Sequence, residues 1–355
     1  MVNTLDTKIV KDDRMQLNRQ SNIELLRIIA IMAIICHHVL VHGVGIYKIP
    51  IAEHNWLYGF VNSLCYTGVN IFILISGYFS IRFSWQKLWH LFLICAVVAG
   101  LGYVWHCYRD DMSIGKNFIY TTVFAFSRNG LWYVLPYVCL FLLSPFINPQ
   151  LESLSRQEFG RLLIVLLVLS CYFGWFWNND VNQNGFGLMQ FVTMYAIGHY
   201  IKRYNVHKIM RTASWGGVII VFSFLQTLLV YYLLRVDGRM FPPVPSIYAY
   251  NSPFLMIASV GCLCYVLNME IRSKVINFVA MSTFGVYLIY WNPYVGKEWI
   301  DLLRPIYTRI RFVGVIGCVL IIYVVATGLD MAIRYGIVNP LHKYSIKAID
   351  MIKKK

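Results

Sequence analysis

The sequence predicts an all-α, polytopic membrane protein. Hydrophobic residues make up 58% of the 355 residues and charged residues only 13%, which is far from the composition of a soluble domain. Apolar stretches of about twenty residues, long enough to cross a bilayer as a helix, recur along the chain. The basic residues, which give a net charge of +15, lie in short segments between these stretches. Membrane topology therefore explains them, and nucleic-acid binding does not.

About ten helices are expected to cross the membrane. Their expected ranges are 22–43, 56–79, 88–107, 131–149, 161–177, 188–201, 215–234, 252–268, 275–295 and 312–334. The segments on the side of the two termini carry the larger share of Lys and Arg, so the positive-inside rule places both termini in the cytoplasm. The segment 235–251, with three prolines, is expected to be an irregular external loop.

Three parts of the chain are expected. Residues 1–21 form a polar cytoplasmic tail, residues 22–340 a membrane domain, and residues 341–355 a basic cytoplasmic tail that suits contact with anionic lipid. Because polar residues precede the first apolar run, the first span is expected to be an uncleaved anchor. The nine cysteines lie in or beside apolar stretches, so we expect neither a disulfide framework nor a metal site.

The first expected span holds an acid, an arginine and three histidines. Ionisable groups within a span are costly and usually mark function. At about 100° per residue, the eleven-residue step puts Arg27 and His38 on one helix face, with Glu24 on the same face and His42 one turn beyond. His37 points about 100° away from His38. Snorkelling of the arginine and helix-to-helix hydrogen bonding by the histidine are the structural alternatives, which this alignment on one stripe makes weaker.

The segment NIELLR, followed by ten residues and a histidine, resembles the first span of the acyltransferase-3 family of integral membrane acyltransferases. Three later segments extend the resemblance: NIFILISGYF (70–79), LWYVLPYVCLFLLSPFIN (131–148) and STFGVYLIY (282–290). The resemblance implies that residues 22–340 are a stand-alone membrane O-acyltransferase of the inner or plasma membrane. It further implies transfer of an acetyl group from cytosolic acetyl-CoA to a hydroxyl of a cell-surface glycan or its lipid-linked precursor. Membrane lipid and polysaccharide-assembly proteins are the partners it suggests.

Acyl transfer to a hydroxyl needs a base and a positive charge. His38 is the candidate base, or the carrier of the acyl group as an acyl-imidazole. Arg27 is the candidate for the phosphates of coenzyme A or for the developing oxyanion. Arg82 and Lys87 are candidates to extend the phosphate-binding surface, although positive-inside charge explains them as well. The family often has a second arginine near Arg82, and histidine where this chain has Tyr290.

Other polar and aromatic residues are candidates to line the site. They are Glu24, His42, Asn70, Ser76, Trp132, Tyr133, Tyr290 and Asn292. Hydrogen bonds between helices and an interfacial aromatic belt explain such residues as well. A transporter that exports a glycan precursor or an acyl donor is the alternative function. Inverted repeats would favour it, and the sequence shows none.

Overall fold

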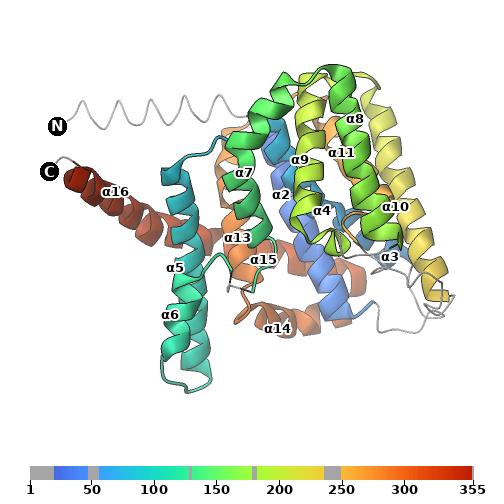
Figure 1. Ribbon diagram of the computed structural model, residues 1–355. Coiled ribbons are helices and arrows are strands. Elements are labelled where there is room, and N and C mark those ends of the chain that lie inside the picture. Colours follow the sequence, from blue (N-terminus) through green and yellow to red (C-terminus); the bar gives the residue numbers. More distant parts are fainter. Residues whose placement is uncertain (1–19, 47–55, 128–129, 178–181, 236–248, 354–355) are drawn as a thin grey trace.

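The computed structural model describes residues 20–46, 56–127, 130–177, 182–235 and 249–353 (Figure 1). All regular elements in these residues are helices, which confirms the all-α prediction. Seven helical segments are long and apolar enough to cross a membrane: Ser21–Val44, Trp56–Phe79, Trp85–Arg109, Val134–Ser153, Arg156–Trp175, Thr212–Tyr232 and Arg311–Met351. Shorter apolar helices cover Pro253–Leu267 and Lys274–Tyr290. The protein is therefore a multi-pass membrane protein, while ten spans and cytoplasmic termini stay predictions.

The helices form one bundle with several short helices at its ends. The longer helices are α2 (Ser21–His38), α5 (Trp85–Arg109), α7 (Val134–Ser153), α8 (Arg156–Leu167), α9 (Leu188–Arg203), α10 (Thr212–Arg235), α11 (Pro253–Leu267) and α15 (Arg311–Ile333). Two expected spans are divided. The second consists of α3 (Trp56–Cys65) and α4 (Thr67–Phe79), and the ninth of α12 (Lys274–Val279), a 3₁₀ turn and α13 (Thr283–Tyr290).

Helix α2 lies inside the bundle (Figure 1) and packs against α4, α11, α12, α13 and α15. Its buried face carries Ile23, Leu26, Ala30 and Ile31, as the helical period requires. Gly68 of α4 allows the closest approach, because a Cβ there would lie 2.7 Å from the carbonyl oxygen of Ala30. After His38 the helix continues as a wider π-helical turn, Val39–Val44.

Helices α4 and α9 cross at two glycines. A Cβ on Gly77 would lie 2.0 Å from the carbonyl oxygen of Tyr195, and a Cβ on Gly198 would lie 2.2 Å from that of Leu74. Small residues let two helix backbones approach closely where lipid replaces water as the solvent. This crossing fixes α4, which carries one wall of the site described below.

Three helices lie where the sequence predicted connections or a tail. They are α6 (Lys116–Val123), α14 (Gly296–Arg309) and α16 (Asn339–Lys353). The C-terminal segment is thus helical as far as residue 353, and α16 projects from the bundle beside the start of α5 (Figure 1). The Trp89 indole nitrogen donates to the Ser345 hydroxyl at 2.7 Å, which joins α5 to α16. Residues 1–19 of the expected N-terminal tail and 236–248 of the expected external loop lie outside the described residues.

Candidate active site

A cavity of about 270 Å³ lies beside α2, between α4, α5, α7 and α13. We call it the α2 chamber. Helix α2 lines it with Arg27, Ile31, Ile34 and His38, one residue from each turn. At about 1.5 Å rise per residue, the first and last members of this stripe are about 16 Å apart along the axis. The arginine and the histidine therefore reach one cavity from two different depths.

Arg27 is held at its end of the stripe by a carboxylate and an aromatic ring. Its Nη1 atom lies 3.4 Å from Glu24 Oε1, and its guanidinium lies 5.8 Å from the centre of the Phe79 ring. Glu24 is only 3% exposed and does not line the chamber. Because an uncompensated buried carboxylate is costly, the arginine stabilises Glu24 as well as lining the chamber. A quarter of the Arg27 side chain stays exposed, which leaves it open to a ligand.

His38 is buried between Tyr290 and Trp291. Its Nδ1 atom lies 2.9 Å from the Tyr290 hydroxyl, and its ring stacks on the Trp291 indole with the ring centres 3.7 Å apart. The hydrogen bond and the stacking together fix the plane of the imidazole. A histidine whose Nδ1 is held in this way presents Nε2 as its second, chemically distinct nitrogen. His38 thus has the oriented geometry that a base or a nucleophile needs.

The other two histidines of the first span do not line the chamber. The His37 Nδ1 atom lies 2.8 Å from Asn62 Oδ1, and the ring meets Tyr66 edge-on. Its function here is contact between α2 and α3. His42 lies in the π-helical turn with its ring centre 5.7 Å from that of His38, and it is exposed. From the sequence, His42 was a candidate to line the site. In the structure it lies beyond the chamber, because the helix widens into a π-helical turn after His38.

Ser76, Trp132 and Tyr133 line the chamber, as their residue types suggested. The two asparagines do not, because their amides bond to other helices. Asn70 donates to the carbonyl oxygen of Tyr250 at 2.8 Å and accepts from Gln190 at 3.0 Å. Asn292 donates to the carbonyl oxygen of Val98 at 3.2 Å and accepts from the backbone N–H of Tyr294 at 3.0 Å. Asn70 thus joins α4 to α9, and Asn292 joins the turn after α13 to α5.

Arg82 and Lys87 lie in the exposed region where α4 gives way to α5, and neither lines the chamber. The Lys87 ammonium donates to the carbonyl oxygen of Arg82 at 3.2 Å. Any contact they make with a donor would be with a part of it that stays outside the chamber.

Sequence reasoning missed ten residues of the chamber wall. Four are aliphatic, and the other six are Phe72, Tyr137, Tyr250, Thr283, Phe284 and Tyr287. The signal for two pairs was present: Tyr133 and Tyr137 are four residues apart on α7, as Thr283 and Tyr287 are on α13, so each pair shares a helix face. Nothing local marked Tyr250, which lies near the end of the expected external loop, 235–251.

The helices and the buried stripe define a multi-pass membrane protein with a largely apolar chamber between its spans, which Arg27 and His38 both line. A family model described as an acyltransferase domain matches residues 20–329, well over half of the chain. The chain therefore belongs to the acyltransferase-3 family, and the resemblance of its first span is confirmed. Neither a comparison with curated proteins nor one with solved structures gave a match. Fold and family together make this protein a membrane acyltransferase.

Proposed function

We propose that the protein moves an acetyl group from cytosolic acetyl-CoA to a hydroxyl of a cell-surface glycan or its lipid-linked precursor, in the inner or plasma membrane. One observation carries most of this proposal. Arg27 and His38 line the same chamber, with the guanidinium nearer the start of α2 and the imidazole at its end. With the predicted cytoplasmic N-terminus, a cytosolic donor meets the arginine first, and an external acceptor meets the histidine.

The size of the chamber supports binding of only part of the donor. At about 270 Å³ it is near the lower end of ligand pockets, which run from about 300 to 1,000 Å³. It therefore suits the acyl group and its pantetheine arm rather than a whole coenzyme A. The nucleotide stays outside, and its phosphates lie toward Arg27. Because about 16 Å of helix separates Arg27 from His38, we assign the arginine to the phosphates and not to an oxyanion beside the histidine.

His38 acts on the acceptor in the first of two routes. The acceptor hydroxyl gives its proton to Nε2 while its oxygen attacks the thioester carbonyl carbon. The carbon–sulfur bond then breaks, and the thiolate leaves with the proton from Nε2. Tyr290 is a positioning residue here, since its oxygen accepts the Nδ1–H of the imidazole at 2.9 Å and holds Nε2 ready.

In the second route Nε2 attacks the thioester itself. The carbon–sulfur bond breaks as the acyl group passes to Nε2, and coenzyme A leaves as the thiolate. The acceptor oxygen then attacks the acyl carbon, the carbon–nitrogen bond breaks, and the hydroxyl proton passes through the freed Nε2 to the thiolate. Both routes use the same histidine and the same tyrosine. Ser76, Trp132 and Tyr133 on the chamber wall supply hydrogen-bonding groups and ring faces for the sugar in either case.

Mass spectrometry of surface glycans tests the proposal. Glycans from cells with the gene should carry an ester-linked acetyl group that is absent from cells without it and restored by the wild-type gene. A normal degree of acetylation together with a loss of surface glycan would contradict the proposal, and would favour export of a glycan precursor. Polysaccharide-assembly proteins are the partners we expect to receive the modified glycan.

A further inference from the structure

A second cavity, of about 460 Å³, lies between the end of α5 and the start of α14, outside the α2 chamber. We call it the α5–α14 cavity. Its lining consists of His106, Arg109, Pro293, Tyr294, Lys297, Glu298 and Asp301. It lies at the same end of the spans as His38, because α2 and α5 run in the same direction under the predicted topology. That end faces away from the cytoplasm.

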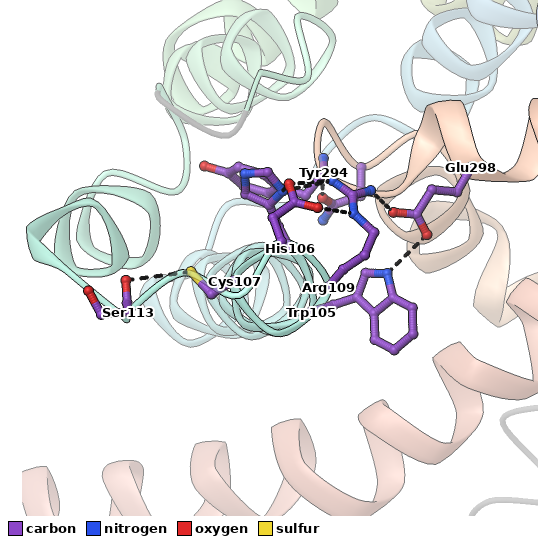
Figure 2. Close-up of polar contacts among 9 residues, drawn as sticks. Trp105, His106, Cys107, Arg109, Ser113, Tyr294 and Glu298 are labelled. Carbon is purple, nitrogen blue, oxygen red and sulfur yellow. Dashed lines mark hydrogen bonds and ion pairs between the residues drawn. The ribbon is translucent and has the colours of Figure 1, made fainter.

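Side chains of both charges line this cavity, and Figure 2 shows the contact between Arg109 and Glu298. Arg109 of α5 contacts the carboxylate of Glu298 on α14, and its Nη2 atom donates to Asp110 at 2.8 Å. The Trp105 indole nitrogen donates to Glu298 Oε2 at 2.9 Å. The Arg109 guanidinium holds the pKa of the Asp110 carboxyl below its ordinary value, so this carboxylate is ionised at neutral pH. The network holds donors and acceptors at set positions on both walls.

The presence of cationic and carboxylate side chains in one lining indicates the class of ligand. Hydroxyl groups both donate and accept, so a polyhydroxylated molecule can match cationic and carboxylate groups side by side. A nucleotide with several phosphates has no such match, because Glu298 and Asp301 offset the charges of Arg109 and Lys297 and leave the lining without a net positive charge. An aromatic pair completes the wall: Tyr294 stacks on His106 with ring centres 5.3 Å apart. A neutral sugar with polar edges and apolar faces fits this lining.

A short, fixed segment joins this cavity to the chamber. Trp291 stacks on His38, and three residues later Tyr294 lines the α5–α14 cavity. Three residues span at most about 10 Å of chain. Asn292, between them, is bonded to the backbone of α5, and Gly102 makes room for it, since a Cβ there would lie 2.5 Å from the asparagine oxygen. A glycan chain bound in the cavity would therefore have its neighbouring sugar close to His38.

We propose that the α5–α14 cavity is a docking site for the carbohydrate acceptor, which holds a sugar unit next to the one that is acylated. This inference rests on the proposed acyl transfer to a glycan. Glu298 and Lys297 hold the sugar hydroxyls, Arg109 fixes Glu298, and Tyr294 provides the ring surface.

Calorimetric titration of purified full-length protein in detergent tests this site. The probe is surface glycan from cells that lack the gene, freed of esters by mild base. Glu298→Gln keeps the size of the side chain but removes its charge, and should weaken glycan binding about tenfold, the loss expected when one charged hydrogen bond is weakened. Lys297→Ala should weaken it about threefold or more. Lys116→Ala, an exposed lysine on α6 outside the cavity, is the matched control and should bind as the wild type.

Coenzyme A affinity is measured on the same variants and should stay at the wild-type value. Unchanged glycan affinity in both Glu298→Gln and Lys297→Ala would overturn the inference, and so would an equal loss in Lys116→Ala. Wild-type protein that binds the glycan through these residues but transfers no acetyl group would leave the docking site standing and refute the proposed function instead.

Discussion

The α2 chamber and the α5–α14 cavity hold their charged groups in opposite ways. At the chamber, His38 on its wall and Glu24 behind it are buried among helices, and the contacts that orient them come from a few neighbours such as Arg27 and Tyr290. In the α5–α14 cavity, Arg109 and its partners are partly exposed and connected to several groups at once. The chamber thus holds a few buried groups in fixed orientations, whereas the α5–α14 cavity distributes its contacts over a network of partly exposed groups.

The difference follows from burial. A buried polar group that loses its partner bears the full cost of desolvation, whereas an exposed group can turn to water. Substitutions in the chamber should therefore have large and specific effects, whereas removal of one exposed contact that only supports Glu298 in the α5–α14 cavity should have a small effect, because its other contacts remain. The chamber is suited to chemistry, which depends on fixed geometry, and the cavity to reversible binding.

Of the three substitutions Tyr290→Phe, Arg27→Lys and Trp105→Phe, the first should have the largest effect. It removes the hydroxyl from His38 but keeps the ring, so the protein should accumulate normally while the imidazole loses the group that orients it. We expect kcat to fall about 10- to 100-fold, a part of the 10²–10⁴ that general acid–base catalysis typically supplies. Steady-state kinetics with labelled acetyl-CoA measures this. An unchanged kcat would show that Trp291 alone orients the histidine.

Arg27→Lys should act on the donor. The charge is kept, but the planar fork that recognises phosphate oxygens is lost, so coenzyme A affinity should fall about tenfold. Arg82→Ala, which removes an exposed charge outside the chamber, is the comparison and should cost less than about threefold. Titration of purified protein with coenzyme A gives both values. Equal affinity in the wild type and Arg27→Lys would restrict the arginine to its contact with Glu24.

Trp105→Phe should have the smallest effect. It removes the indole N–H from Glu298, but Arg109 still holds that carboxylate. We expect the midpoint of thermal unfolding to change by less than about 2 °C and glycan affinity by less than about twofold. A loss as large as that of Tyr290→Phe would mean that the network around Glu298 is not redundant, and would remove the contrast between the two sites.

The helical period alone predicted which residues of the first span come together. Arg27 and His38 are eleven residues apart, a spacing that any regular helix places on one face, and Glu24 and Arg27 are one turn apart. The contact between His38 and Tyr290 joins residues 252 positions apart, and no local pattern in one sequence can pair them. Partners of this kind depend on how whole helices pack.

Two further differences have physical causes. Helix α14 was missed because a search for long apolar stretches passes over amphipathic helices, although Ile300, Leu303 and Tyr307 mark one buried face at helical spacing. Asn70 and Asn292 were placed at the site because polar residues in spans often mark function. In the structure their amides bond to other helices, which is the other common use of a polar group in a membrane.

The role of His38 is the central claim, and acetyl transfer by His38→Ala at matched protein levels tests it most directly. The assay is transfer of labelled acetyl from acetyl-CoA to de-esterified surface glycan in proteoliposomes, with His37→Ala as the neighbouring control. His38→Ala should lose activity at least about 10²-fold, and completely if the acyl group passes through the imidazole, while His37→Ala should retain more. Full activity in His38→Ala would contradict both routes and leave the chamber without a catalyst.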